Sequence, residues 1–253
     1  MCTLTLVPTE HGYLAGMNRD ELLSRPQALP PKVSQQHSVE IVYPRESAGG
    51  TWIACNAQGN LVALLNWNCG ESPYVGEKRR TRGLVIPELI GEPDLSATDS
   101  HYRHMNLDGL FPFRLVGVFW REQTINEWRW DGAASRKFEI PWARKHWFSS
   151  SLSDSSAEKE RGRECAAAAS QPAIGSKGWL RSLHRSHIPE PGPFSVCVHR
   201  PDAATVSYTE VRCHGSLISM DYLAGNPCLK EGFDEHASIF LRDPMIHSNL
   251  TEL

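Results

Sequence analysis

The stretch "MCTLTLVP" at residues 1–8 places a cysteine directly after Met1 and then alternates polar with apolar residues. Alternation at a period of two predicts a half-buried strand over Cys2–Val7. Turn-forming residues follow at 8–12, and Tyr13–Met17 predicts a second short strand. The chain is therefore expected to open as a hairpin, with a cysteine at the start of its first strand.

The rest of the sequence alternates groups of strands with pairs of helices. Further strands are predicted at 39–43, 49–55, 61–67, 113–120, 124–130, 194–199 and 205–212. Helices are predicted at 82–90, 96–107, 155–170 and 177–187, with an irregular loop at 24–31 and a weakly patterned stretch in the last thirty residues. This order is not a repeating βαβ unit, so it favours an α+β fold in which antiparallel sheets pack together with helices outside.

Length and composition limit the class of protein. A chain of 253 residues with 40% hydrophobic residues can bury a sizeable core, so we expect one domain over 1–253. A net charge of -3 gives no global field to attract nucleic acid or an anionic membrane. No run of about 20 apolar residues and no basic leader with an apolar stretch is present, which predicts a cytoplasmic protein without a membrane span. The oligomeric state is left open.

Cysteines and histidines give no metal signature in the sequence. The seven cysteines are odd in number, widely scattered and without a CxxC pair, which indicates reduced thiols. Cys197 and His199 would share a strand face, but one such pair is half a metal site, so we expect two partly buried strand residues. His184 and His187 are three apart and are expected to be solvated helix histidines. No metal site is predicted.

Cys2 can be interpreted in two ways. Methionine before a small residue is normally removed, and Cys2 would then carry a thiol and a free α-amine. An α-amine has a pKa near 8, so it can act as a general base close to neutral pH. Nucleophile and base would then lie on one residue. The alternative is a small hydrophobic residue at the start of a buried strand.

The polar tetrapeptide at 18–21 is predicted to end the second strand of the hairpin. Because antiparallel neighbours lie about 5 Å apart, the hairpin brings this tetrapeptide back to the chain start. The carboxylate of Asp20 can hold an α-ammonium group, and Arg19 can stabilise a thiolate and lower its pKa. A solvated charged turn is the alternative interpretation.

Several short motifs occur together and in order. They are "MC" at 1–2, "NRDE" at 18–21, "SRP" at 24–26, "GGTW" at 49–52, "GNLVALLNW" at 59–67 and "RG" at 82–83, followed more loosely by "PW" at 141–142 and "CVHRPDAATVSYT" at 197–209. Together they resemble the NRDE family, also called transport and Golgi organisation 2. The resemblance is strong over the first third of the chain and thinner beyond it.

That family is similar to N-terminal nucleophile hydrolases of the penicillin V acylase and bile salt hydrolase type. The resemblance implies a four-layer αββα sandwich and cleavage of a linear, non-peptide amide by Cys2 as nucleophile and base. It further implies that Asp20 orients the amine and that Asn66 donates a hydrogen bond in the oxyanion hole, where one such bond contributes about 3 kcal/mol.

The sequence also departs from the acylase pattern. The acylases usually have Arg-Asn-x-Asp where this chain has residues 17–20 as Met-Asn-Arg-Asp, so the arginine is displaced by two positions. Arg19 can point the same way but starts nearly 7 Å further along the strand. The second oxyanion asparagine has no clear match, and Ser150 or Ser151 falls in its region. Eukaryotic relatives have Gly-Thr-Arg where residues 204–206 are Ala-Thr-Val.

Two functional hypotheses follow. The first is an amidohydrolase or acyl-transfer enzyme that acts through Cys2 on a small N-acyl or acyl-thioester compound and uses no cofactor. Trp52 and Trp67 would line its acyl pocket, and Asn18 would contact the substrate. The second is a non-catalytic protein on the same fold that binds or traffics haem or a lipid such as acyl-CoA, because the family has been linked to haem and lipid handling. The sequence has no CxxCH haem motif.

Overall fold

The computed structural model describes residues 2–68, 80–188 and 190–242, and its strands form two antiparallel sheets. The first sheet has the order β10-β1-β2-β11-β12-β13. Its strands are β1 (Cys2–Thr9), β2 (Gly12–Leu22), β10 (Lys145–Ser149), β11 (Ala203–His214), β12 (Leu217–Ala224) and β13 (Glu235–Phe240). The chain therefore opens as the predicted hairpin, with β1 inside the sheet between β10 and β2.

The second sheet is a meander in chain order, β3-β4-β5-β6-β7-β8-β9. Its strands are β3 (Leu29–Gln36), β4 (Val39–Arg45), β5 (Ile53–Asn56), β6 (Asn60–Asn66), β7 (Phe113–Phe119), β8 (Thr124–Trp130) and β9 (Ser135–Ile140). Because each strand pairs with the next, short turns are enough to connect most of them.

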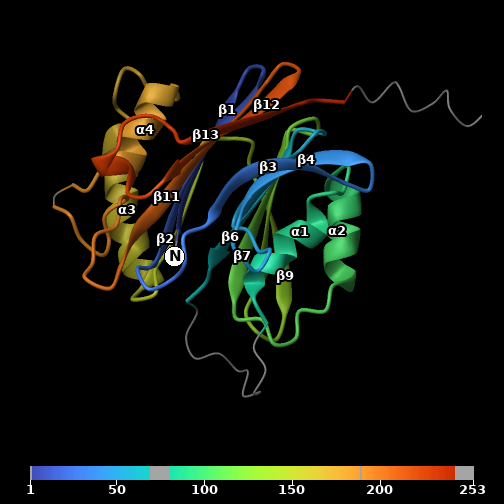
Figure 1. The fold of residues 1–253 in the computed structure, drawn as a ribbon, viewed down its shortest axis with the longest axis horizontal. Helices are drawn as coiled ribbons and strands as arrows, with labels where there is room; N and C mark the ends of the chain where they lie inside the picture. Colours follow the sequence, from blue (N-terminus) through green and yellow to red (C-terminus); the bar gives the residue numbers. More distant parts are fainter. Residues whose placement is uncertain (1, 69–79, 189, 243–253) are drawn as a thin grey trace, which may run out of the picture.

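Helices cover the outer face of each sheet, so the molecule has four layers (Figure 1). The helices are α1 (Val85–Leu89), α2 (Leu95–His104), α3 (Asp154–Ala168) and α4 (Lys177–Arg185), with two 3-10 turns, η1 (Arg82–Leu84) and η2 (Pro227–Leu229). In Figure 1, α3 and α4 lie against the sheet that contains β1 and β2, and α1 and α2 lie on the far side of the other sheet.

Three apolar cores fill the spaces between the four layers. The central core lies between the sheets and joins side chains such as Leu4 and Met17 to Ile53 and Leu61. A second core packs the β3–β9 sheet against α1 and α2, and a third packs the other sheet against α3 and α4. This arrangement confirms the predicted α+β fold as an αββα sandwich.

The β2 strand is longer than predicted. It continues through Asn18, Arg19 and Asp20 to Leu22, so the tetrapeptide is not a solvated turn. All three of these polar side chains are buried. A strand tolerates buried polar residues where each finds a partner, and here the partners come from distant segments described below.

The segment 194–199 is not the predicted strand; only His199 forms a bridge, to Ala204. Its amides bond elsewhere: Cys197 N–H donates to the Ser186 carbonyl and His199 N–H to the Gly192 carbonyl. Strands also occur where none was predicted. They are β12, β13 in the weakly patterned last thirty residues, and β3, which starts at residue 29 in the expected loop.

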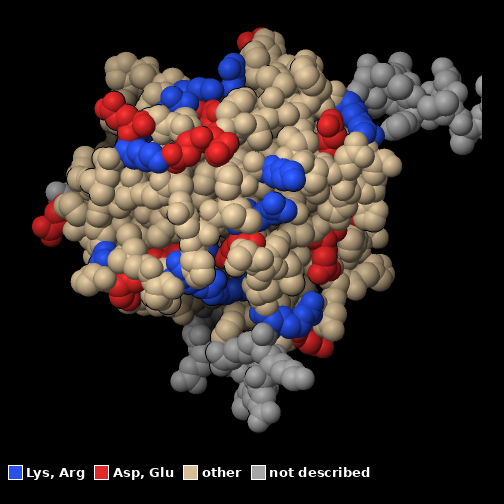
Figure 2. All heavy atoms as spheres, in the orientation of Figure 1, with Lys and Arg blue, Asp and Glu red and all other residues tan. Residues whose placement is uncertain are grey.

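Charged side chains of both signs are mixed on the surface. On the face drawn in Figure 2, Lys and Arg side chains lie beside Asp and Glu side chains in small groups. Neighbouring opposite charges largely cancel beyond the Debye length of about 10 Å. In the described part of the chain, no helix combines the length and the apolarity needed to cross a bilayer.

Candidate active site

Cys2 begins β1 and has a strand on each side. Its Cα partners are Arg19 of β2 and Ser149 of β10. Because side chains alternate along a strand, Cys2 and Leu4 belong to the core between the sheets, whereas Thr3 bonds to α3 on the other face. The alternation seen in the sequence thus directs the thiol toward the space between the sheets.

A cavity of about 200 Å³ lies at this end of the sandwich. Its lining includes five residues singled out in the sequence, namely Cys2, Arg19, Asp20, Trp52 and Asn66. Hollows of about 590 and 560 Å³ occur elsewhere in the described residues. The smaller cavity is the candidate site because it joins a thiol, guanidinium groups, carboxylates and an amide.

The backbone of Cys2 is held at both ends. Its amide nitrogen donates to Ser149 Oγ at 2.9 Å, and its carbonyl oxygen accepts from Arg161 Nη1 at 3.3 Å. The residue is 5% exposed. Burial raises the pKa of its thiol, and the nearby Asp20 adds to this rise while Arg19 opposes it. The thiol is therefore protonated near neutral pH and needs a base before it can attack.

Asp20 is fully buried beside this backbone. Its Oδ1 accepts a hydrogen bond from Thr205 Oγ1 at 2.7 Å, and its Oδ2 lies 3.4 Å from Arg161 Nη2. Burial raises the pKa of the Asp20 carboxyl, while Arg161 and the Thr205 hydroxyl oppose the rise. A carboxyl in this position can orient an amine at Cys2.

Arg19 already has partners for its charge. Its guanidinium lies 4.6 Å from the centre of the Trp52 ring, and its Nη2 contacts Glu46 Oε1 at 2.6 Å and Glu21 Oε2 at 3.4 Å. Two carboxylates compensate one guanidinium, so little of its positive charge remains for a thiolate at Cys2. This pairing agrees with the raised pKa of the Cys2 thiol.

Asn66 ends β6 and lines the cavity with a half-buried side chain. The two serines in the region of the second oxyanion donor are used elsewhere. Ser150 Oγ accepts from Leu152 N at 3.2 Å, and Ser151 Oγ accepts from Arg200 Nη1 at 3.1 Å. Neither serine is among the residues that line the cavity. Asn66 is therefore the amide available to an oxyanion there.

The structure does not bring Asn18 or Trp67 to the cavity lining. Asn18 precedes Arg19 in the strand and faces the helices, where its Nδ2 donates to the carbonyls of His184 at 2.8 Å and Val196 at 2.9 Å. The Trp67 ring lies 6.0 Å from the guanidinium of Arg129. Asn18 points away from the cavity because neighbouring residues on a strand face opposite sides of the sheet, and Arg19 faces the cavity.

Sequence reasoning missed Arg161, which is fully buried on α3. Besides the carbonyl of Cys2 and the carboxylate of Asp20, its Nη1 reaches Thr3 Oγ1 at 2.8 Å. The buried side chains of α3 recur at Ala157, Arg161, Cys165 and Ala168. An arginine at helical spacing within a small apolar stripe was the available signal.

Arg82 also lines the cavity, from the Arg-Gly motif at 82–83. Burial lowers its pKa, and the nearby Cys2 and Glu21 oppose this. Its Nη1 donates to the Pro112 carbonyl at 3.0 Å. The motif was noted in the sequence, but the direction of this side chain depends on β7 and its preceding loop, which lie thirty residues away.

A second cavity, of about 340 Å³, adjoins the first and shares Arg19, Glu21 and Arg25 with it. Its remaining walls are mostly apolar and are formed by the segment after β2 and by β11, β12 and the loop after β12. They include Leu22, Leu23, Pro26, Ala28, Val206, Tyr222 and Ala224. The two cavities together form a polar compartment beside the thiol and an apolar compartment next to it.

Comparisons with solved structures give similarities at 9% sequence identity. One is a mutant of conjugated bile acid hydrolase from Clostridium perfringens, with a TM-score of 0.48, covering 96% of this chain and 97% of that one. Another is penicillin V acylase from Agrobacterium tumefaciens, with a TM-score of 0.49, covering 88% of this chain and 86% of that one. No curated protein sequence matches.

A comparison with protein-family models matches residues 1–171, a segment that contains Cys2, Arg19, Asp20, Asn66 and Arg161. The match covers more than half of the 253 residues. The chain therefore belongs to the Transport and Golgi organisation 2 family.

Proposed function

We propose that this protein is an N-terminal cysteine amidohydrolase that cleaves a small N-acyl compound, with Cys2 as nucleophile and base after removal of Met1. The observation that carries the proposal is the cavity in which Cys2, Asp20 and Asn66 meet. The thiol has a raised pKa, so it depends on a base, and the α-amine of the same residue supplies one.

The reaction begins when the α-amine takes the thiol proton and the sulfur attacks the amide carbonyl carbon. A C–S bond forms and the carbonyl oxygen becomes an oxyanion, which accepts a hydrogen bond from the Asn66 amide. Asp20 keeps the α-amine oriented, and its own carboxylate is held by Thr205 and Arg161. The C–N bond then breaks, and the leaving amine carries away the proton that the α-ammonium group returns.

Hydrolysis of the acyl-enzyme uses the same groups. The α-amine removes a proton from water, the hydroxide adds to the thioester carbonyl, and the C–S bond breaks to release a carboxylic acid. The thiolate recovers its proton from the α-ammonium group. Arg161 assists by position alone, because it holds the carbonyl of Cys2 and the carboxylate of Asp20 at once.

The adjoining cavity supports an acyl group as the part of the substrate that is recognised. Its apolar walls suit a hydrocarbon chain, and its volume of about 340 Å³ suits a short to medium one. Arg25 in the polar compartment is paired with Glu21 and Glu46, so a leaving group with a carboxylate would be recognised through Arg82. N-acyl amino acids therefore form the first substrate panel.

The test combines intact mass with turnover. The purified protein is expected to lack Met1, and Cys2→Ala is expected to lose turnover of every substrate that the unchanged protein cleaves. Cys165→Ala is the matched control, because Cys165 is a buried thiol on α3 outside the cavity. Asp20→Asn is expected to lower kcat by about 10²-fold or more.

Two outcomes would refute the proposal. Retention of Met1 on an active protein would leave no free α-amine at Cys2. Full turnover by a folded Cys2→Ala variant would remove the nucleophile from the mechanism.

A further inference from the structure

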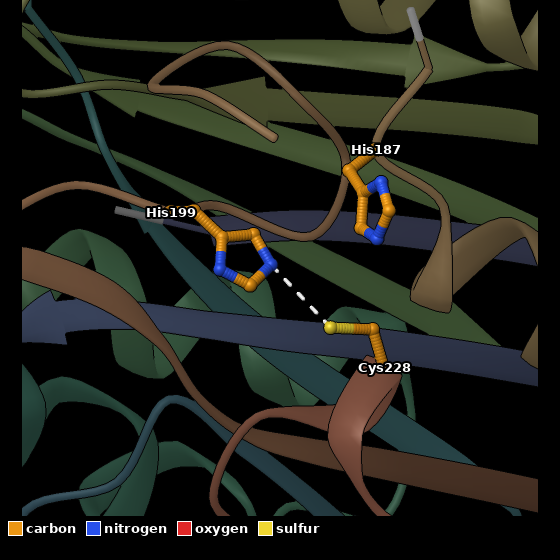
Figure 3. Close-up of side chains that lie close together, drawn as sticks. All are labelled: His187, His199 and Cys228. Carbon is orange, nitrogen blue, oxygen red and sulfur yellow. Dashed lines mark hydrogen bonds between the residues drawn. The ribbon is translucent and has the colours of Figure 1, made fainter. Parts of the chain in front are cut away.

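Three side chains that can ligate a metal converge beside η2, outside the cavity that holds Cys2 (Figure 3). His187 follows α4, His199 precedes β11, and Cys228 lies in η2. One ligand atom of each lies within 4.8 Å of the others, and His199 Nε2 is 3.4 Å from Cys228 Sγ. Figure 3 shows the two rings and the thiol facing a common space.

The backbone around these residues fixes their approach. The Cys197 amide donates to the Ser186 carbonyl at 2.8 Å, which ties the segment that carries His199 to the one that carries His187. The His199 amide donates to the Gly192 carbonyl at 3.1 Å. The segments that carry His187 and His199 are thus held together by a backbone hydrogen bond.

Asn226 contacts the proposed ligand atoms directly in the absence of an ion. Its Oδ1 accepts from Cys197 Sγ at 2.9 Å and from Cys228 Sγ at 3.0 Å, and its Nδ2 lies 3.5 Å from His199 Nε2. These contacts hold the ring and the sulfur in place without the ion. They are exchanged for metal–ligand bonds when Cys228 loses its proton and His199 Nε2 gives its lone pair to the ion.

We propose that His187, His199 and Cys228 bind one Zn²⁺ ion. Tetrahedral zinc with Zn–N of about 2.05 Å and Zn–S of about 2.3 Å places a nitrogen and a sulfur ligand about 3.5 Å apart. The separation of His199 Nε2 from Cys228 Sγ is 3.4 Å. The three ligand atoms lie within 4.8 Å of one another, so the His187 nitrogen has to move by at most about 1.5 Å to complete the tetrahedral geometry. The fourth position takes water.

The donor set selects the class of ion. Two imidazole nitrogens and one sulfur favour Zn²⁺ and related transition metals over Mg²⁺ or Ca²⁺, which prefer oxygen. On binding, the Cys228 S–H bond breaks, its proton goes to solvent, and the sulfur keeps the electron pair that it gives to the ion. Neither the metal nor the protein changes oxidation state.

Bound zinc would join three segments that meet next to the candidate active site. His199 forms an isolated β-bridge with Ala204, and the hydroxyl of the next residue, Thr205, donates a hydrogen bond to the carboxylate of Asp20. The site thus steadies the turn in front of β11, and it does so whether or not Cys2 is catalytic. A Cys2→Ala variant is therefore expected to bind zinc as the unchanged protein does, which keeps failure of this proposal separate from failure of the proposed function.

The experiment uses Co²⁺ as a coloured substitute for Zn²⁺ on the full chain after treatment with a chelator. We expect one Co²⁺ per chain, a thiolate-to-cobalt charge-transfer band, and the intense visible absorption of tetrahedral Co²⁺. Zn²⁺ is expected to abolish both signals, and excess Mg²⁺ to leave them unchanged.

Variants identify the ligands. Cys228→Ser is expected to remove the charge-transfer band, and His187→Asn and His199→Asn to weaken binding by at least about tenfold. Two matched controls, Cys165→Ala and His104→Asn, are expected to keep the spectrum, because Cys165 lies on α3 and His104 on α2. A band that persists in Cys228→Ser, or no band in the unchanged protein, would overturn the proposal.

A second measurement needs no substitution. Zn²⁺ is expected to slow the alkylation of Cys228 in the unchanged protein by at least about tenfold. Mass spectrometry of the peptide that contains Cys228 measures the rate. An alkylation rate that zinc leaves unchanged would count against the site even if the variants failed to fold.

Discussion

His184 makes the stability of this protein depend on pH. The side chain is fully buried on α4, and its Nε2 lies 3.0 Å from Thr5 Oγ1 of β1. Burial lowers its pKa from 6.5 to about 3, and the nearby His146 adds to the effect. The folded protein therefore holds this ring neutral at pH values where the unfolded chain protonates it.

The size of the effect follows from the two pKa values of His184. A lowered pKa in the folded state stabilises the protein fully above pH 6.5, and this stability is lost as the pH falls toward 3. The loss is about 1.4 kcal/mol per pH unit in that window, so it reaches about 3 kcal/mol between pH 7 and pH 4.5. The ceiling, reached below pH 3, is about 5 kcal/mol.

The measurement compares urea unfolding at pH 7 and pH 4.5, followed by tryptophan fluorescence. His184→Gln keeps a polar group near Thr5 but cannot be protonated, so its free energy of unfolding should fall by about 3 kcal/mol less than that of the unchanged protein. Burial also lowers the pKa of His146, to about 4. His146 is present in both proteins, so subtracting one loss of stability from the other removes its own contribution. His104→Gln, at an exposed position of α2, is the control. If both variants lost as much stability as the unchanged protein, the reasoning about burial would be refuted.

Two further predictions concern packing, each with a control on α3. Arg161→Met leaves the carboxylate of Asp20 buried without its ion pair and should lower the free energy of unfolding by about 3–5 kcal/mol, whereas the exposed Arg163→Met should change it by less than about 0.5 kcal/mol. Similar losses from the two variants would contradict this account of the pair. A Cβ at Gly117 would lie 2.8 and 2.9 Å from two aromatic rings, so Gly117→Ala should cost about 1–3 kcal/mol, while Gly162→Ala, which meets nothing within 4 Å, should stabilise the protein by about 0.5–1 kcal/mol. Urea unfolding measures both, and a neutral Gly117→Ala would show that the rings give way.

Local patterning was enough to predict most of the fold. The alternation over Cys2–Val7 predicted β1, and the order of strands and helices predicted layers of antiparallel sheets with helices outside. The prediction that the second strand ends at Met17, before the tetrapeptide at 18–21, was wrong, because buried polar residues in a strand depend on distant partners. The carbonyls that accept from Asn18 belong to His184 and Val196, and no local pattern reveals them.

The candidate site could be predicted only in part, for the same physical reason. The register of the β1–β2 hairpin places Arg19 opposite Cys2, so local pairing suffices for these two residues. Arg161 approaches from a helix and lies 159 residues after Cys2, and Ser149 approaches from another strand, 147 residues after Cys2. Contacts of that range depend on how the layers pack, which periodicity does not encode.

The alternation of β1 also constrains how this gene can evolve. Cys2 and Leu4 face the space between the sheets while Thr3 and Thr5 bond to the helix layer, and β10 and β2 clamp the strand on both sides. If one codon were inserted or deleted between positions 2 and 9, every residue before the change would point to the opposite face of the sheet. The thiol of Cys2 would then point toward α3. Substitutions that keep the polarity of each position leave the face of the thiol unchanged. The opening segment should therefore accept point mutations far more readily than a change of length.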